Sequence, residues 1–503
     1  MQKESRNCRF SSYLKQSCVL LACLGASQSV WSQDDDDTKR QQDYAIEPRL
    51  EVGATFSDNV NLQENDRVSD LVLRASPGIN LRGNGRRFEG SLDYSADFLW
   101  FLNDGDTDIR HNLFGLANAE VVRDHFFLSG RATIQETFLD REEGFSGNIA
   151  NRSANRQVVQ TYTGEARLQG RFNNVANWSI GYELGLTFSP ADDLDNENLS
   201  TFFSDSVSHE VTALVDSGDR FSNLRWQLFA NARRVSRSID EAGSFRDDRA
   251  GVDLTYKLTR EFALVGSAGV SNNDFNIFLL DNDGFFWNSG FLWTPSDRLT
   301  LTARAGKDGE RTTVSGSFFH RLSKRVNIEA SYTDELSTNS LILNDNLDTF
   351  NFNNQFGIVD GNGRTLNNID PSFTLSDVDF RRRFGRVRLE WFRKRTTLFV
   401  TGDAEWRTFD NNTGTARTLG GSVGYDRNLD RKTTLRVAAS YRRTEFENSA
   451  RVDNFILGSV SWTRRLSRHI NLSVSYNYSD RLSNEAGQDI RENAVSAFIR
   501  GTF

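Results

Sequence analysis

Residues that could carry enzyme chemistry are few in this chain, and they do not form a metal or nucleotide site. Five histidines occur, but there is no His-Glu-x-x-His pattern and no glycine-rich phosphate loop. His111 is followed by Asn112, and an outer-membrane hydrolase that used Asn, His and Ser would need further partners from other strands. We therefore predict that the chain is not an enzyme and has no catalytic, cofactor or metal site.

The N-terminal segment 1–32 has the composition of a signal peptide. Four basic residues precede the apolar stretch CVLLACLGA, and small residues surround the predicted cleavage positions, Gln28 and Ser32. The three cysteines are Cys8, Cys18 and Cys23. Cleavage at either position removes all three, so the mature chain would hold no disulfide and no thiol nucleophile. A lipid anchor on Cys23 is the alternative, but only about five apolar residues would precede it, fewer than a signal core needs.

Residues 33–46 are predicted to form an acidic spacer. Segment 1–32 contains four of the 60 basic and one of the 68 acidic residues, which leaves 56 basic against 67 acidic residues in the mature chain. This balance argues against nucleic acid as a partner. The acidic run at 34–37 is interpreted as solvated chain, with a cation site as the alternative.

From residue 47 to 503 the sequence repeats segments of alternating polarity, the pattern of β-strands with two different faces. In 470–478, for example, one face carries Ile470, Val474 and Tyr476, and the other carries asparagine and serine. Hydrophobic residues make up only 37% of the chain, and no stretch approaches the roughly 18 consecutive apolar residues of a membrane helix. We predict an all-β fold, a transmembrane antiparallel up-and-down β-barrel of about 22 strands (range roughly 18–24).

The breaks between these segments alternate between short and long. Short breaks such as 123–125 and 467–468 alternate with longer polar ones, and the longest is a loop at about 338–375. In outer-membrane barrels the short turns lie in the periplasm and the longer loops lie outside the cell. Pro77-Gly78 interrupts the segment 68–82, where we predict a bulge or bend.

Aromatic and basic residues recur at the short turns. The segments 256–264, 319–328, 425–435 and 462–472 each place an aromatic residue before the turn and a cation within it. Rings suit the membrane interface and cations suit headgroup phosphates, so we expect contacts with outer-membrane lipids and lipopolysaccharide. Phe503 ends a run of alternating apolar residues, which resembles the signal that the barrel-assembly machinery recognises.

The polar face of each strand would line the lumen of such a barrel. The candidate lumen-lining residues are Arg386, Arg388, Glu390, Asp403, Glu405, Arg407, Arg225 and Phe229. The basic stretch 381–395 has two interpretations: mixed charges balanced by acids on the next strand, or a cationic stripe that guides an anionic substrate. Phe229, Phe399 and Phe498 are predicted to point inward, where they could stack on sugar rings or pack an internal plug.

Two segments near the start of the predicted barrel resemble a known family. These are EPRLEVGATFSDNVNL (47–62), with Ser57-Asp58-Asn59, and the segment 69–100, with Pro77-Gly78 and Tyr94. Both are similar to outer-membrane proteins associated with the PEP-CTERM/exosortase system, which are related to a broader group of porin-type β-barrels. The resemblance implies a link to exopolysaccharide production and brings no catalytic motif with it.

The predicted barrel and the family resemblance are compatible with three functions. The first is a passive conduit or secretion component for exopolysaccharide, with polysaccharide and periplasmic export proteins as partners. The second is a general or substrate-specific diffusion porin, and the third is a structural or adhesive surface barrel. A TonB-dependent transporter also has 22 strands, but its plug domain does not fit the start of the strands about fifteen residues after the predicted cleavage site.

Overall fold

The computed structural model describes residues 43–138, 146–148, 150–152, 156–189, 203–238, 244–273, 283–348, 351–352, 358–359, 377–409, 414–446 and 450–503. The predicted signal peptide, nearly all of the acidic spacer and much of the predicted long loop lie outside these residues.

Alternating side chains make strands of twelve or more residues along most of the described chain. The strands of the main sheet are β1 (Asp43–Ser57), β2 (Asp70–Asn84), β3 (Phe88–Phe101), β4 (Thr107–Val122), β5 (Phe126–Phe138), β6 (Arg156–Phe172), β7 (Ala176–Phe188), β8 (Ser206–Ser217), β9 (Leu224–Arg237), β10 (Ser244–Lys257), β11 (Phe262–Asn273), β12 (Gly284–Ser296), β13 (Leu299–Asp308), β14 (Arg311–Ser323), β15 (Val326–Ser337), β18 (Phe380–Arg393), β19 (Thr396–Phe409), β20 (Thr415–Asn428), β21 (Thr433–Glu445), β22 (Val452–Arg465), β23 (Ile470–Ser483) and β24 (Ile490–Thr502).

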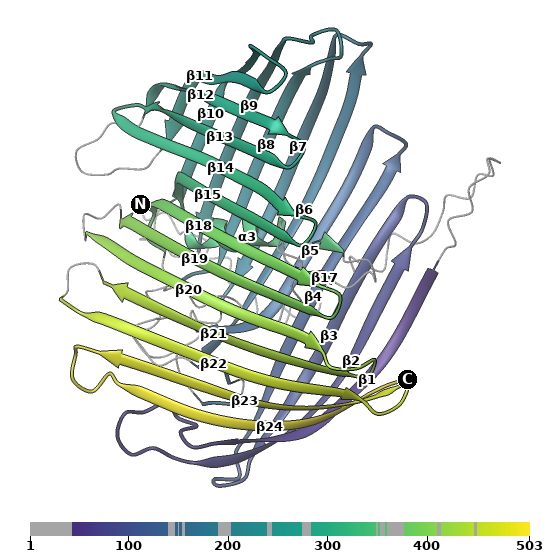
Figure 1. The fold of residues 1–503 in the computed structure, drawn as a ribbon, viewed down its shortest axis with the longest axis vertical. Helices are drawn as coiled ribbons and strands as arrows, with labels where there is room; N and C mark the ends of the chain where they lie inside the picture. Colours follow the sequence, from purple (N-terminus) through teal and green to yellow (C-terminus); the bar gives the residue numbers. More distant parts are fainter. Residues whose placement is uncertain are drawn as a thin grey trace, which may run out of the picture. The chain divides into compact units, whose positions relative to one another are not determined.

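These 22 strands form one antiparallel sheet that closes on itself (Figure 1). Each strand pairs with the next strand of the sheet along the chain, and β1 pairs with both β2 and β24. Closure leaves no free edge in the sheet, so every barrel strand has a hydrogen-bonded neighbour on both sides. The prediction of an all-β antiparallel barrel of about 22 strands is confirmed.

The connections differ between the two ends of the barrel. At one end, here named the turn end, ten connections of no more than six residues join the strands, from 85–87 to 466–469. At the other end, the loop end, the connections reach their greatest length at 338–379. Three loop-end connections, 102–106, 309–310 and 410–414, have five residues or fewer and are shorter than the predicted pattern. Each contains a glycine with positive φ (Gly105 +78°, Gly309 +59°, Gly414 +117°).

Pro77 lies inside β2 without a bulge, which corrects the prediction made for Pro77-Gly78. The register of β2 with β3 is the same on both sides of this site, since Ala75 pairs with Phe98 and Gly78 pairs with Ser95. Only the ladder to β3 is interrupted at residues 76 and 77, where proline has no N–H to donate.

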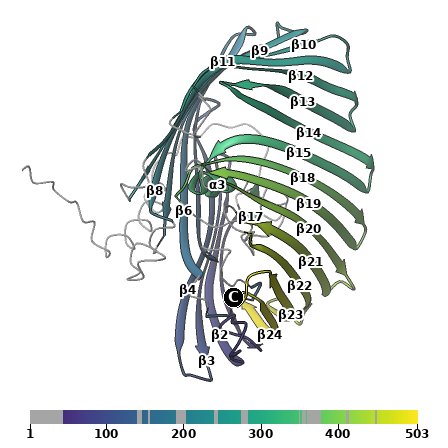
Figure 2. The same ribbon diagram turned by 90° about the vertical axis from the view of Figure 1, so that its left-hand side faces the viewer.

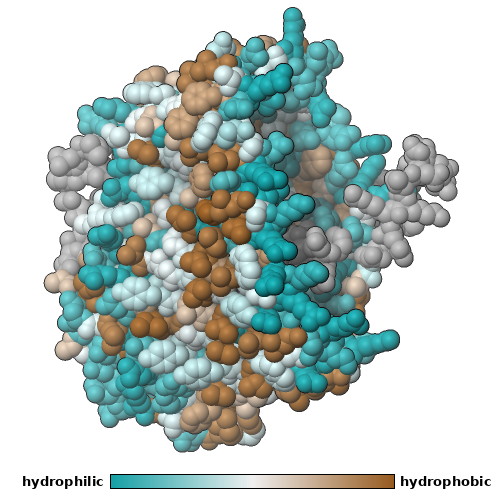
Figure 3. Space-filling model, viewed as in Figure 1, coloured by the Kyte–Doolittle hydropathy of each residue, from teal (hydrophilic) through white to brown (hydrophobic). Residues whose placement is uncertain are grey.

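The outer surface of the barrel carries the apolar side chains. In β1 the even-numbered residues Leu50, Val52 and Phe56 are exposed, while the odd-numbered polar residues between them are half-buried or buried. Figure 3 shows brown apolar side chains gathered in a belt across the strands, with hydrophilic side chains at its margins. An apolar exterior with a polar interior is the reverse of a water-soluble fold and is typical of a barrel in lipid.

Exposed aromatic rings lie at both ends of this belt. At the turn end they include Tyr44, Phe88, Phe172, Tyr256, Trp293 and Phe392, and at the loop end Phe98, Trp100, Phe285, Trp287 and Tyr441. Phe88 and Phe98 lie ten residues apart on β3, about 33 Å along a strand. At the usual tilt of about 40° this corresponds to a height of about 25 Å, which matches the apolar layer of an outer membrane.

The connection between β15 and β18 was predicted as a loop, but it contains a helix. The helix α3 (Asn339–Asp348) begins after Thr338, whose hydroxyl accepts a hydrogen bond from the Leu341 amide at 3.1 Å. A small hairpin follows, formed by β16 (Asn351–Phe352) and β17 (Ile358–Val359). Within the described residues, no helix is long and apolar enough to cross a membrane.

Candidate functional site: the inner wall of the barrel

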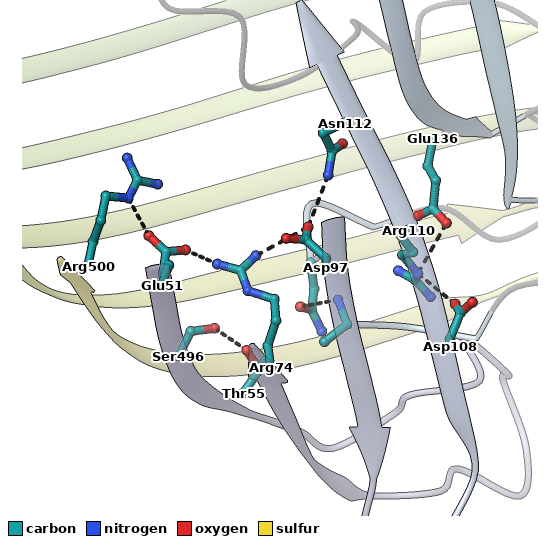
Figure 4. A network of polar contacts seen from close by, with 12 residues as sticks. Glu51, Thr55, Arg74, Asp97, Asp108, Arg110, Asn112, Glu136, Ser496 and Arg500 are labelled. Atoms are coloured by element: carbon teal, nitrogen blue, oxygen red, sulfur yellow. Dashed lines mark hydrogen bonds and ion pairs between the residues drawn. The ribbon is translucent and has the colours of Figure 1, made fainter. Parts of the chain in front are cut away.

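The inner face of the sheet carries rows of charges of alternating sign (Figure 4). In one row, Arg500 of β24 donates to Glu51 of β1 at 2.7 Å, and Glu51 contacts Arg74 of β2. Arg74 also lies 3.8 Å from a carboxylate oxygen of Asp97 on β3, which accepts from the Asn112 amide at 3.0 Å. Each cation is thus placed beside an anion of a neighbouring strand.

The same alternation recurs elsewhere on the inner wall. The Arg110 guanidinium lies 3.1 Å from Glu136, which also contacts Arg156 at 3.1 Å. Farther around the ring, Asp308 of β13 accepts from Arg249 at 2.9 Å and from Arg311 at 2.5 Å. A wall of paired charges is polar enough to face water and has little net charge of its own.

The predicted residues of β18 and β19 lie on this inner face. The register pairs Arg386 with Asp403 and Arg388 with Thr401. Arg388 contacts Glu390 on its own strand. These contacts follow the mixed-charge interpretation of the stretch 381–395 at this part of the wall.

Glu405 and Arg407 form a closer group with a neighbouring arginine. Glu405 accepts from Arg407 at 2.6 Å and from Arg382 at 3.2 Å, and all three side chains are largely buried. Arg407 also donates to Asn339 of α3 at 3.0 Å. Arg382 was not among the predicted residues, although its even parity with Arg386 placed it on the same face.

Arg225 and Phe229 lie on the inner face of β9, where they occupy different environments. Arg225 is exposed at the turn end of the barrel. Phe229 is half-buried, and its ring lies 6.2 Å from the ring of Phe286 on β12. A Cβ added to Gly251 of β10 would lie 3.0 Å from the Phe229 ring, so this glycine leaves the space that the ring fills.

Phe399 and Phe498 follow the same rule as Phe229. Each lies beside a glycine on the next strand, Gly424 for Phe399 and Gly53 for Phe498, and a Cβ on either glycine would overlap the ring. Because the rings cover glycines, they pack along the wall of the barrel. Among the described residues, the partners of these rings are therefore glycines of the wall. The sequence had left two other partners open, an internal plug or a bound sugar.

The structure separates the residues that could suggest catalysis. His111 lies on the outer face, where its Nδ1 is 2.8 Å from the Tyr94 hydroxyl, while Asn112 bonds Asp97 on the inner face. The sequence 420–424 reads Gly-Gly-Ser-Val-Gly, a nucleophile-elbow pattern, but it lies in the middle of β20 and not at a strand-to-helix turn. Among the described residues, no group of three or more His, Cys, Asp or Glu could hold a metal ion.

The helix α3 lies inside the ring of strands, near its loop end (Figure 2). Asn339 at its start bonds Arg407 of β19, and Asn344 bonds Ser208 of β8 at 2.9 Å. Asp345 lies 3.6 Å from Arg233 of β9. Since β8 and β9 are far around the ring from β19, the helix spans the lumen and is held at both sides.

The apolar residues of α3 add to these polar contacts. Leu341, Ile342, Leu343 and Leu347 are buried, and Leu341 packs with Val235, Phe245 and Leu336 of the barrel. The sequence signal for the helix was weak, since its apolar residues are clustered and several asparagines interrupt them. The threonine before the helix is the local signal that could have indicated its start.

A second inward contact surrounds Glu492 of β24, which the sequence did not single out. Its buried carboxylate accepts from Ser57 at 2.5 Å and from Asn148 at 2.8 Å, and it also contacts Ser146. Ser146 and Asn148 belong to the connection between β5 and β6. This part of the connection is therefore held on the inner wall near the seam between β24 and β1.

Comparison with known protein families gives a match to the C-terminal part of the chain. The family model described as "Putative beta-barrel porin 2" matches residues 388–503, from the middle of β18 to the end of β24. These residues are similar to that family, and the described chain as a whole forms a closed 22-stranded β-barrel. No curated protein matches the barrel.

Solved structures of outer-membrane proteins match the chain at low similarity. The ferric enterobactin receptor PfeA of Pseudomonas aeruginosa, in a mutant complex with enterobactin, is 10% identical with a TM-score of 0.42, over 92% of this chain and 82% of that chain. The FrpB iron transporter of Neisseria meningitidis is 10% identical with a TM-score of 0.40, over 92% and 83%. A loop-deletion mutant of OmpT from Vibrio cholerae is 10% identical with a TM-score of 0.30, over 92% and 99%.

Proposed function

We propose that this barrel is a passive diffusion pore for small hydrophilic solutes, and that α3 sets its width. The observation that supports the proposal is the position of α3, which crosses the lumen between Arg407 on one wall and Ser208 and Arg233 on the other. A solute that passes through the lumen must pass beside this helix. The paired charges of the wall give such a solute a wet, polar path.

Passive diffusion fits the inner wall better than catalysis or tight capture does. Carboxylates such as Glu405 and Asp308 are held in ion pairs with arginines of the wall. A pore gains nothing from tight binding, because a solute that enters must also leave. The inner wall therefore favours the passage of a solute over its retention or chemical conversion.

Export of exopolysaccharide is the second candidate. It is supported by the resemblance of segments 47–62 and 69–100 to exopolysaccharide-linked barrels and by the inward, half-buried rings of Phe229 and Phe399, which would stack on sugars. A polymer of linked sugars is wider than a small solute, so α3 would have to leave the lumen during export. Periplasmic export proteins would then be the partners that supply the polymer.

The test is the single-channel conductance of the purified barrel in a planar bilayer. Ser337 and Phe380 are partners across β15 and β18, so residues 338–379 can be replaced by a turn of about four residues. Wild-type barrels should show a small, steady conductance, and the shortened variant a conductance several-fold larger. Heat-modifiable migration in electrophoresis verifies that both variants form closed barrels.

Two outcomes separate the candidates. Equal conductance of the wild type and the shortened variant would show that α3 does not set the width, and absence of conductance in both would refute the pore. Deletion of the gene tests export: loss of polymer outside the cell with accumulation in the periplasm, reversed by the intact gene, would favour the conduit. Unchanged polymer in both compartments would exclude it.

A further inference from the structure

A pocket of about 400 Å³ opens on the inner rim of the barrel at the turn end. It is formed by three successive connections: the turn after β18, the turn after β20 and the end of β22 with the start of β23. Four cations line it, Arg395, Arg431, Lys432 and Arg465. The pocket is therefore strongly basic, unlike the paired wall above it.

The pocket belongs to the lumen and not to the lipid surface. Arg465 of β22 has the same parity as Phe455, which is buried inside the barrel against Leu62 and Ile490. The register pairs Arg465 with Asn471, which in turn pairs with Arg500 of the inner charge row. Arg465 and Asn471 thus point to the inside, where a solute in the lumen meets them.

The single acid among the residues that line this pocket offsets only one of its four positive charges. The Asp430 carboxylate accepts hydrogen bonds from the Lys432 amide at 2.6 Å and from the Thr433 hydroxyl at 2.9 Å. These hydrogen bonds lower the pKa of Asp430 from its usual 3.8 and so keep it ionised and occupied within its own turn. Within the described part of the chain, the pocket's four cations form no ion pair.

The neutral residues of the pocket indicate what kind of anion fits. Asn428, Thr434, Thr463 and Asn471 place hydroxyl and amide groups among the cations. Guanidinium groups bind carboxylates with paired hydrogen bonds, and hydroxyl and amide groups are suited to the hydroxyls of a sugar. The combination matches a saccharide that carries carboxylate groups, and the volume suits a few sugar units at most.

We propose that this pocket is a binding site for acidic oligosaccharides at the turn-end mouth of the barrel. The inference rests on the proposed pore function and names its substrate class: acidic saccharides are concentrated at this mouth before they pass α3. Cations at the mouth of a channel raise the local concentration of anions, and this effect weakens as salt increases.

Block of the ion current tests the site without any assay of transport. Trigalacturonate added on the turn-end side should interrupt the current of the wild-type barrel, whereas the neutral maltotriose should not. In the double variant Arg395→Gln/Arg465→Gln, the half-blocking concentration should rise about tenfold or more, the loss expected for charge-assisted hydrogen bonds. The matched control, Arg260→Gln/Arg325→Gln, removes the same charge from two turns outside the pocket and should leave the block unchanged.

The possible failures are distinguishable. If no variant conducts, the pore function fails and the site remains accessible to direct measurement, since tritium-labelled trigalacturonate can be bound to the folded barrel in detergent. If the barrel conducts but the two double variants respond equally, general rim charge explains the block and the pocket is refuted. Loss of block in bilayers of anionic phosphatidylglycerol but not in bilayers of zwitterionic phosphatidylcholine would assign the pocket to anionic lipid headgroups and would also overturn the proposal.

Discussion

The Arg74 guanidinium of β2 lies 4.1 Å from the centre of the Phe498 ring of β24, although β1 runs between their strands. The register places Gly53 of β1 opposite both residues, so the three form one row across the seam where the barrel closes. Because glycine has no side chain, Arg74 can reach over β1 to the ring. A cation–π contact therefore joins the second strand to the last, in addition to the backbone ladder that joins β1 to β24.

Gly53→Ala should weaken this seam. An added Cβ would lie 2.8 Å from the Phe498 Cα and would overlap the ring, which would push Phe498 away from Arg74. We expect the free energy of unfolding to fall by about 1–3 kcal/mol, as for overpacked cores. Urea unfolding in lipid vesicles measures it. Gly164→Ala is the control, since a Cβ there meets no heavy atom within 4 Å, and equal losses in both variants would contradict the prediction.

A disulfide should lock α3 to the wall. The Asn344 amide donates to the Ser208 hydroxyl at 2.9 Å, so Ser208→Cys/Asn344→Cys places two thiols close together. The described residues contain no other cysteine. We expect oxidation to form the cross-link, detected by mass spectrometry, and to leave conductance unchanged. A conductance that falls on oxidation and recovers on reduction would show that the helix normally leaves this position. Asn344→Cys alone controls for effects of the oxidant.

Glu492→Ala should release the inward part of the β5–β6 connection. The change removes the acceptor shared by Ser57, Ser146 and Asn148 and leaves their buried donors without it. We expect a loss of about 1–3 kcal/mol for the local structure, seen as faster proteolysis between β5 and β6 in the intact barrel. Glu492→Gln keeps one acceptor oxygen and should show a smaller effect. Identical cleavage rates in all three proteins would refute the role of Glu492.

Tyr94→Phe should destabilise the outer face of the sheet between β3 and β4. The Tyr94 hydroxyl lies 2.8 Å from Nδ1 of His111, and the Tyr182 hydroxyl has the same geometry with His209. Loss of this hydrogen bond should lower the free energy of unfolding by about 0.5–1.5 kcal/mol. The comparison is Tyr256→Phe, an exposed tyrosine at the turn end, which should change unfolding little. A larger loss of stability in Tyr256→Phe would contradict the prediction that the hydrogen bond between Tyr94 and His111 stabilises the barrel.

The turn that contains Asp430 should be insensitive to pH over the neutral and mildly acidic range. Its pKa is lowered in the folded barrel, so its hydrogen bonds stabilise the turn above the unfolded value and are lost as the pH falls through the lower, folded value. The amide chemical shift of Lys432 should stay constant from about pH 7 to about pH 5 and change only below about pH 4. A change in the Lys432 chemical shift near pH 6 would contradict this prediction. So would a change below about pH 4 that is still seen in the Asp430→Asn variant.

The strand pattern was predictable from the sequence because it repeats a local rule. Alternation in segments such as 470–478 requires no knowledge of distant residues, and a one-residue error would put every apolar side chain into the lumen. The same parity placed Arg388 and Glu405 on the inner face before their partners were known. The bulge predicted at Pro77 is absent, because a strand can accommodate a proline by an interruption of the ladder as well as by a bulge.

The contents of the lumen depend on contacts that no local pattern records. Asn344 meets Ser208 across 136 residues, and Ser57 meets Glu492 across 435. Which loop folds inward depends on the shape of the closed ring, and this shape exists only after β1 has paired with β24. The basic pocket was equally hidden, since its arginines come from three different turns and each turn alone resembles an ordinary hairpin.

The charge rows described on the wall are paired, whereas the four cations of the turn-end pocket are not, so charge is distributed unevenly along the described part of the lumen. A barrel inserted in one orientation should then rectify: at equal and opposite voltages its currents should be unequal, and the inequality should shrink as salt rises. In a cell such an asymmetry cannot favour one side at equilibrium, since a passive pore has no energy source. It changes only the rate at which a charged solute enters the barrel from either side, so anions and cations should enter at different rates.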